Sequence, residues 1–363
     1  TILYLIVFVL VQLVSGAALG ATLVTGLAAW LRRLFSVPGI LALLYFLVPL
    51  GLGKAFTSDR DWANRITQIR IFFNPVPTTD WGFRNFLGGA LFEQPVLTAQ
   101  APGDEQSLYV LERVGRVYRV ALPAGAPELI LDIRDQLGEV EVENGALGMA
   151  FHPQFAGGAA PYLYLYYTDT RPPQGQHNRV SRFDLSASDP EARRATELPL
   201  MILEREGSGF HNGGSLEFGP DGYLYIAIGE GVRTPQGKTS AEVLRAAILR
   251  IDVDERTENL PSEPFAFGEL TNYRVPADNP FVEDPRIRNE YWALGLRNPF
   301  RMQFDEETGA LWAGDVGSTV WEEVNRIERG MHYQFPVVEG REPTGKSGWE
   351  SLDLPERGPV YTY

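Results

Sequence analysis

The sequence contains no cysteine, and only four of its 363 residues are histidine. Without cysteine, no disulfide can stabilise the fold. Basic residues are also in the minority, because 32 Lys and Arg stand against 46 Asp and Glu and the formal net charge is −14. This acidic balance argues against nucleic acid as a partner and against broad electrostatic adhesion to anionic lipid. It carries no information about neutral small molecules.

Charge is almost absent from the beginning of the chain. Ile2–Leu31 and Leu34–Gly53 are uncharged runs of 30 and 20 residues, separated only by Arg32 and Arg33. Since about 20 apolar residues are enough to cross a bilayer, these runs predict a transmembrane helical hairpin over residues 1–56. A cleaved signal peptide is the alternative, but the first run is too long for one and a second run follows it.

Residues 57–79 differ from both neighbouring parts. Ser58 is a plausible N-cap for a helix over residues 58–73, whose apolar side chains recur at spacings of four, three and four, at Trp62, Ile66, Ile69 and Phe73. Such an amphipathic helix can lie along a membrane surface or pack on the following domain, and the pattern leaves both open. Asn74–Thr79, with the sequence NPVPTT, ends the helix and predicts a linker.

From Asp80 onward, short runs of alternating apolar residues are punctuated by Gly, Pro, Asp and Asn, which predicts an all-β domain over residues 80–363. Phe218–Gly229 and Phe304–Asp315 form the clearest repeat, and their turn glycines lie 87 positions apart. Because a propeller blade takes about 40–50 residues, this separation predicts a β-propeller with equivalent hairpins two blades apart. A β-sandwich is the alternative, although it would not require such a repeat.

Two long motifs, Phe210–Gly231 and Trp292–Asn325, resemble the glucose/sorbosone dehydrogenases, which oxidise aldose sugars with pyrroloquinoline quinone (PQQ). The resemblance extends from about Phe92 to Tyr363. It implies a propeller of the six-bladed type whose C-terminal blades are missing from this sequence. It also implies PQQ and calcium as cofactors and a sugar as substrate.

His211 is the candidate catalytic base. Removing hydride from a sugar carbon requires a base for the hydroxyl proton, and a neutral imidazole suits that task near pH 7. His211 precedes Asn212-Gly213-Gly214 and a predicted strand, so its ring can project from the end of a blade. A lone histidine is often structural, but the resemblance implies that this one is the catalytic base.

The other site residues rest on the resemblance. It implies that Arg297 and Asn298 face the quinone, where a guanidinium can stabilise developing negative charge and take part in catalysis. Bonding of Arg297 to loop carbonyls is the structural alternative. Asn144 stands where the family has a glutamine that contacts substrate. Calcium, which prefers hard oxygen ligands, is assigned to the matching loop, at Gly317, Ser318 and Glu323, although the acidic side chains there also suit a solvated face.

Two functions of different classes follow from these observations. The first is a membrane-anchored PQQ-dependent aldose dehydrogenase, with its hairpin in the cytoplasmic membrane and its propeller on the periplasmic side. The second is a non-catalytic propeller that serves as an accessory subunit of a respiratory or photosynthetic membrane complex. Expected partners are a sugar, membrane lipid and other membrane-protein subunits, and no nucleic acid. The count of flanking cations favours a cytoplasmic domain instead, because Arg32 and Arg33 are outnumbered by cations that follow the second run, at Lys54, Arg60, Arg65 and Arg70.

Overall fold

The structure is a computed structural model in which the chain divides into two units, Thr1–Arg84 and Asn85–Tyr363. The predicted hairpin, amphipathic helix and linker lie outside the described residues. Within the part of the chain that is described, no helix is long and apolar enough to cross a membrane. The described residues are 86–87, 89–123, 125–137, 140, 143–171, 176–203, 209–231, 243–263, 272–347 and 352–363.

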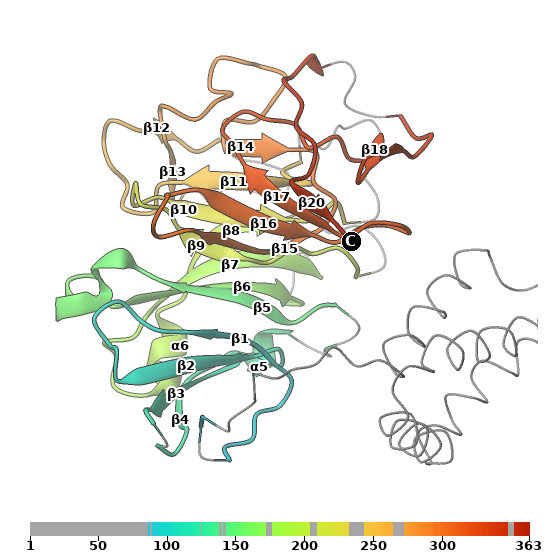
Figure 1. The fold of residues 1–363 in the computed structure, drawn as a ribbon. Coiled ribbons are helices and arrows are strands. Elements are labelled where there is room, and N and C mark those ends of the chain that lie inside the picture. The colour runs from blue at the N-terminus through green and yellow to red at the C-terminus, as the bar shows by residue number, and fades with distance from the viewer. Residues whose placement is uncertain are drawn as a thin grey trace, which may run out of the picture. The chain divides into compact units, whose positions relative to one another are not determined.

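The described residues of the second unit form four antiparallel sheets of four strands each (Figure 1). The first sheet contains β1 (Pro95–Ala99), β2 (Ser107–Glu112), β3 (Arg116–Ala121) and β4 (Glu128–Asp132). The second contains β5 (Ala146–Phe151), β6 (Tyr162–Asp169), β7 (His177–Asp184) and β8 (Leu198–Leu203). The third contains β9 (Leu216–Phe218), β10 (Leu224–Ile228), β11 (Ala247–Ile251) and β14 (Tyr291–Leu294). The fourth contains β15 (Pro299–Phe304), β16 (Leu311–Asp315), β17 (Glu323–Ile327) and β20 (Tyr361–Thr362).

The remaining elements are short. Two small hairpins pair β12 (Leu260–Pro261) with β13 (Arg274–Val275) and β18 (Val338–Glu339) with β19 (Glu342–Pro343). Helical turns occur at α5 (Arg134–Leu137), η2 (Pro153–Gly158) and α6 (Pro190–Ala195). The predicted all-β propeller is therefore confirmed, since the blade-like sheets stack around one another in chain order (Figure 1).

The core consists of three apolar layers between successive sheets, and strand periodicity explains how one strand serves two layers. In β6, Leu163 and Leu165 pack toward the first sheet, whereas Tyr164 and Tyr166 pack toward the third. All four side chains are fully buried. Because alternate residues of a strand point to opposite faces, a strand buried on both sides must be apolar at nearly every position. Each such side chain contributes about 1.5–3 kcal/mol to folding through burial.

The predicted repeat is correct in kind and wrong in spacing. Phe218–Gly229 and Phe304–Asp315 each run from the last residue of the first strand of a sheet, β9 or β15, through the turn and the second strand, β10 or β16. These sheets are adjacent, however, and not separated by another blade, because β10 and β15 are in contact. The reason is the long connection between Ile251 and Tyr291, which includes the β12–β13 hairpin and delays the last strand of the third sheet.

This architecture brings the predicted site residues to one end of the propeller. The first strands β5, β9 and β15 belong to successive sheets and contact one another in that order. Asn144 lies just before β5, His211 before β9, and Arg297 with Asn298 before β15. Because each sheet repeats the same strand order, the segments that enter these first strands converge.

Candidate active site

His211 has an unusual backbone. Its φ is 57°, in the left-handed region that non-glycine residues rarely occupy. Its N–H donates to Glu143 Oε2 at 2.7 Å, which supports this conformation. Gly213 follows at φ 65°, and a Cβ there would lie 2.6 Å from the carbonyl oxygen of Ala227. Backbone strain of this kind costs about 1–3 kcal/mol and tends to occur at functional sites.

The His211 ring lies between a carboxylate and a guanidinium. Its Nδ1 is 2.7 Å from Glu230 Oε1, and its Nε2 is 2.8 Å from Arg297 Nη2. A guanidinium only donates hydrogen bonds, so Nε2 must accept and Nδ1 must carry the proton that goes to Glu230. The ring is therefore a neutral tautomer with its lone pair on Nε2, and 16% of the side chain is exposed. This is the form that a general base requires.

Arg297 is held in place by the loop after β16. Its Nη1 donates to the carbonyl oxygens of Val316 and Gly317, each at 2.8 Å. The structural alternative, a guanidinium bonded to loop carbonyls, is thus observed, and it coexists with the contact to His211. The same side chain bridges the loop and the imidazole across 86 positions of sequence.

Asn298 is 5% exposed and acts on the His211 loop through its side chain, since its Oδ1 accepts from the N–H of Gly213 at 2.9 Å. Asn144 is 3% exposed, and the side chain that reaches His211 from that segment is Glu143, its neighbour. Contact of Asn298 with the cofactor and of Asn144 with substrate both stay predictions.

Three carboxylates of the site were not identified from the sequence, namely Glu143, Glu230 and Asp315. Glu230 is the next-to-last residue of the first motif and Asp315 ends β16 in the second, so both lay within matched segments. Only the register of the strands shows that they face His211 and Arg297. Asp315 is 5% exposed, and burial raises its pKa to about 7, although the N–H groups of Arg297 and Asn298 offset part of that effect.

Of the residues predicted to bind calcium, Gly317 and Ser318 lie on the loop between β16 and β17, and Glu323 is the first residue of β17. Gly317 offers its carbonyl oxygen to Arg297, and the N–H of Ser318 donates to Glu339 Oε1 at 2.8 Å. Glu323 accepts from the N–H of Gly340 at 2.6 Å, and burial raises its pKa. Within the described residues, no group of three or more acidic or histidine side chains is arranged to hold a metal ion. Calcium at this loop stays a prediction.

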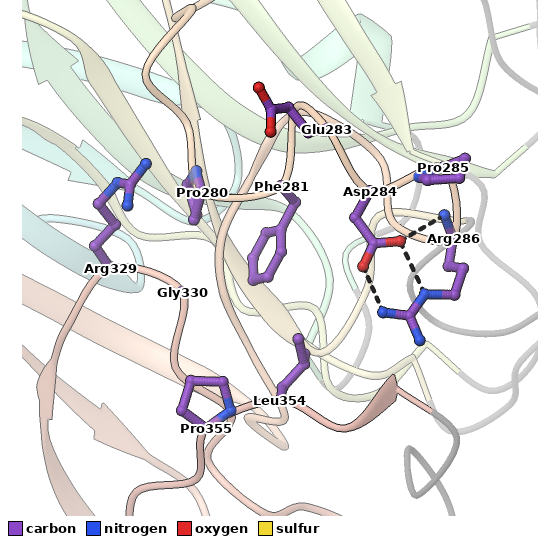
Figure 2. A pocket seen from close by; sticks show the side chains of 10 residues that line it. All are labelled: Pro280, Phe281, Glu283, Asp284, Pro285, Arg286, Arg329, Gly330, Leu354 and Pro355. Carbon is purple, nitrogen blue, oxygen red and sulfur yellow. Dashed lines mark hydrogen bonds and ion pairs between the residues drawn. The ribbon is translucent and has the colours of Figure 1, made fainter.

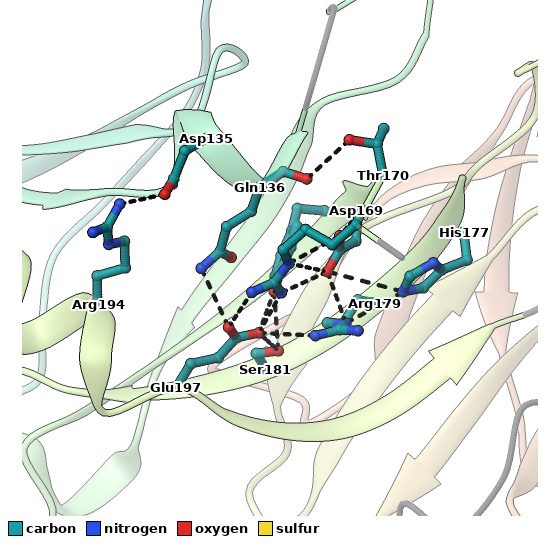
Figure 3. A network of polar contacts seen from close by, with 11 residues as sticks. Asp135, Gln136, Asp169, Thr170, His177, Arg179, Ser181, Arg194 and Glu197 are labelled. Atoms are coloured by element: carbon teal, nitrogen blue, oxygen red, sulfur yellow. Dashed lines mark hydrogen bonds and ion pairs between the residues drawn. The ribbon is translucent and has the colours of Figure 1, made fainter. Parts of the chain in front are cut away.

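A second polar network lies at the second sheet (Figure 3). Asp169 contacts Arg171 at 2.6 Å and Arg179 at 3.1 Å, and Glu197 contacts the same two guanidiniums at 3.1 and 3.3 Å. Although burial alone would raise it, the hydrogen bonds from Arg171 hold the pKa of Asp169 below its usual value. The two carboxylates and the two guanidiniums neutralise one another, so the network suits a structural role.

A separate chain of hydrogen bonds joins the second sheet to the His211 loop. Thr168 Oγ1 donates to Asn178 Oδ1 at 3.0 Å, and Asn178 Nδ2 donates to Asn212 Oδ1 at 3.0 Å. Tyr166 adds a hydrogen bond from its hydroxyl to the carbonyl oxygen of Asn212 at 2.8 Å. The segment next to His211 is therefore fixed from the second sheet as well as from the fourth.

An open surface pocket of about 560 Å³ has none of the candidate site residues in its lining (Figure 2). Its lining includes Phe281, Arg329 and Leu354, with Arg286 bound to Asp284 in the same loop at 2.6 Å. Arg329 follows the end of β17, whereas Glu323, on the side of the candidate site, begins that strand. The pocket is thus at the opposite end of the fourth sheet and offers nothing to the chemistry at His211.

Comparison with known proteins agrees with this geometry. Over 198 residues, the chain is 32% identical to an aldose sugar dehydrogenase, YliI, of Escherichia coli K12, covering 54% of this chain and 47% of that protein. It is 30% identical over 224 residues to the human Hedgehog-interacting protein, covering 58% of this chain and 30% of the relative. The chain therefore spans less than half the length of either curated relative.

A solved structure gives the same result for the fold. It is the PQQ-bound form of an aldose sugar dehydrogenase from Streptomyces coelicolor, which superimposes with a TM-score of 0.55 at 25% identity and covers 77% of this chain and 70% of its own. The family model for glucose/sorbosone dehydrogenase matches residues 92–357. The chain therefore belongs to the glucose/sorbosone dehydrogenase family.

Proposed function

We propose that the protein is a PQQ-dependent aldose dehydrogenase with His211 as its base. One observation carries the proposal, namely a neutral imidazole whose Nε2 lone pair faces a guanidinium and whose Nδ1–H is held by a carboxylate. Membership of a dehydrogenase family and similarity to a PQQ-bound structure support it. When bound, PQQ supplies a quinone that accepts the hydride from the sugar carbon.

Proton transfer is assigned to His211 and Glu230. The sugar hydroxyl loses its proton to Nε2, which leaves the imidazole protonated at both nitrogens. Glu230 stabilises that cation because its carboxylate already accepts from Nδ1. The guanidinium of Arg297 occupies the Nε2 lone pair in this structure, so the hydroxyl has to displace Nη2 before it can transfer its proton.

The described residues fit an anionic quinone. PQQ carries carboxylates, and the His211 site offers Arg297 as a cation. Arg245 also lies near Gly231, since a Cβ added there would be 3.2 Å from its Nη1, but Arg245 is 3% exposed and is not open to a ligand. Charge-assisted hydrogen bonds from guanidinium groups suit both quinone and carboxylate oxygens.

Calcium belongs to the same proposal. Gly317 and Ser318 would contribute backbone oxygens and Glu323 a carboxylate oxygen, all hard donors of the kind that calcium prefers. Binding would replace the hydrogen bond from Arg297 to the Gly317 oxygen. The freed guanidinium would then be available to the quinone.

Membrane anchoring through residues 1–56, with the propeller on the periplasmic side, completes the proposal. The uncharged runs 2–31 and 34–53 support it. Membrane lipid is then a partner, and other membrane subunits become candidates, whereas the acidic balance argues against nucleic acid. Protease added to intact spheroplasts should digest the propeller. Protection of the propeller until the membrane is lysed would show that the flank-charge count, and not the family, gives the orientation.

The test of the chemistry compares two histidines. The full chain, supplied with PQQ and calcium, should reduce an artificial electron acceptor when an aldose is added. His211→Gln should lower kcat by about 10²–10⁴-fold and leave PQQ affinity nearly unchanged, because a general base contributes to rate more than to ground-state binding. His152→Gln is the matched control, because His152 is buried and its Nε2 bonds to Asp254. Failure of the folded wild type to bind PQQ would exclude the proposal.

A non-catalytic propeller is the second candidate, and similarity to a protein named for its interaction with Hedgehog favours it. The two uncharged N-terminal runs also suit packing among other membrane helices. Under this alternative the full chain would copurify with membrane subunits, and His211→Gln would change neither that association nor stability.

A further inference from the structure

Asp315 occupies a special position behind the candidate base. It is the last residue of β16, and its two carboxylate oxygens accept from two consecutive backbone N–H groups. Oδ2 accepts from Arg297 at 2.8 Å, and Oδ1 accepts from Asn298 at 2.6 Å. The next residue, Val316, donates its N–H to the carbonyl oxygen of Asn298 at 3.2 Å. The Arg297-Asn298 segment is therefore clamped against the end of β16.

The clamped segment supports His211 from two sides. The carbonyl oxygen of Arg297 accepts from the N–H of Glu230 at 2.8 Å, and Glu230 holds the ring at Nδ1. The side chain of Asn298 holds Gly213, two residues after His211. The guanidinium of Arg297 contacts the ring itself at Nε2. Every one of these contacts starts from backbone that Asp315 fixes.

We propose that Asp315 is a positioning residue that sets the geometry of His211 and Arg297 without touching the reacting atoms. The effect of Asp315 on kinetics rests on the proposed dehydrogenase function. Its effect on the geometry of His211 and Arg297 does not. A carboxylate suits this task because both of its oxygens accept, whereas the isosteric amide of asparagine would direct an NH₂ group at one of the two N–H donors. That mismatch would push Arg297 or Asn298 away from β16.

The chain offers a control in Asp252, a carboxylate that is also buried and also accepts from two backbone N–H groups. Its oxygens bind the N–H groups of Asp254 at 3.0 Å and Arg256 at 2.7 Å. Asp254 in turn contacts His152 Nε2 at 2.9 Å. Asp252→Asn therefore repeats the same chemical change next to a different histidine.

The experiment uses imidazole nitrogen-15 resonances of the full chain, labelled at histidine and without cofactor. Asp315→Asn should shift the His211 resonances and leave those of His152 in place. Asp252→Asn should do the reverse. A folded Asp315→Asn protein with unchanged His211 resonances would overturn the proposal, and so would equal effects of both variants on His211, because equal effects indicate general loosening.

Kinetics supply the functional arm. With PQQ and calcium, Asp315→Asn should lower kcat by about 10–100-fold and change the KM for aldose much less, since small misplacement of reacting groups has effects of that size. Asp252→Asn should leave kcat within about twofold of the wild type. A rise in KM with unchanged kcat, or an equal fall of kcat in both variants, would overturn the positioning role. If the wild type turns over no aldose, the proposed function fails, and the resonance shifts still decide the role of Asp315.

A measurement on the wild type covers the case in which Asp315→Asn does not fold. Amide hydrogen exchange should protect the N–H groups of Arg297 and Asn298, because each ends on a buried carboxylate. The N–H of Arg286 bonds to the carboxylate of Asp284 in an exposed turn at 3.0 Å and provides the comparison. Exchange of the Arg297 and Asn298 amides as fast as that of Arg286 would refute the clamp.

Discussion

Glu217 is a half-buried carboxyl, and its replacement should remove a pH dependence of stability. It lies on β9 opposite Tyr225 of β10, so its side chain is on the face that packs toward the fourth sheet. Tyr225 on that face contacts the ring of Phe304, with centroids 5.0 Å apart. Glu217 makes no hydrogen bond or ion pair with any described residue. Burial is the cause that raises its pKa to about 7.

The sign and size of the effect follow from this shift. The native state holds the proton more tightly than the unfolded chain, whose value is 4.5. The associated stability is fully present below pH 4.5 and is lost as the pH rises through about 7. Each pKa unit corresponds to about 1.4 kcal/mol, so the complete loss amounts to at most about 3 kcal/mol. Glu217→Gln keeps the shape and removes the ionisation, and should therefore gain stability only at alkaline pH.

Urea unfolding followed by tryptophan fluorescence measures this difference. The free energy of unfolding of Glu217→Gln is compared with that of the wild type at two pH values. The difference in favour of the variant should be about 2–3 kcal/mol larger at about pH 8.5 than at about pH 4.5. Glu342→Gln is the control, because Glu342 is exposed on β19 and should show no pH-dependent gain. An equal effect of Glu217→Gln at both pH values would show that the carboxyl is not desolvated in the native state, and the argument from burial would be wrong.

Two further predictions concern the packing around the site. Burial lowers the pKa of His332 to about 4, so the free energy of unfolding should fall by up to about 3 kcal/mol as the pH drops from 6.5 toward 4, and His332→Gln should flatten that slope in acid urea titrations. Gly148→Ala should cost more than about 3 kcal/mol by thermal unfolding, because a Cβ there would overlap the carbonyl oxygen of Gly214. Gly309→Ala, at φ 67° with open space, should cost only about 1 kcal/mol, and equal costs for the two alanines would contradict the close approach.

The fold and three residues of the site could be predicted from the sequence because their signals are local. Alternation of apolar residues with turn glycines specifies strands, and a matched motif contains His211 with its following glycines. Arg297 and Asn298 stand directly before β15, so any hairpin prediction for the second motif places them at a strand entrance. The alternation in β6, YLYLYYTD, predicts a half-buried strand, whereas the structure buries it on both faces.

The remaining features depend on register and on distance in space. Nothing local distinguishes Glu230 or Asp315 from the other acidic residues of the chain, and both became recognisable only when β10, β15 and β16 were placed side by side. The prediction that one blade separates the two repeated hairpins was wrong for a related reason. The repeat gives a separation in sequence, but the long insertion before β14 determines how many blades that separation contains.

A comparison of His211 with His152 supports a catalytic role for His211 over a purely structural one. His152 has ordinary backbone angles, is 2% exposed, and satisfies both ring nitrogens, by accepting from the Gln154 N–H and by contacting Asp254. His211 also has partners at both ring nitrogens, Glu230 and Arg297, but it differs in its left-handed backbone and its more exposed ring. Strain of this kind costs about 1–3 kcal/mol and tends to be kept where it serves a function. A base would gain a fixed tautomer and a lone pair on Nε2 that becomes available once the Arg297 guanidinium is displaced. The backbone of His211 therefore supports its proposed role in proton transfer.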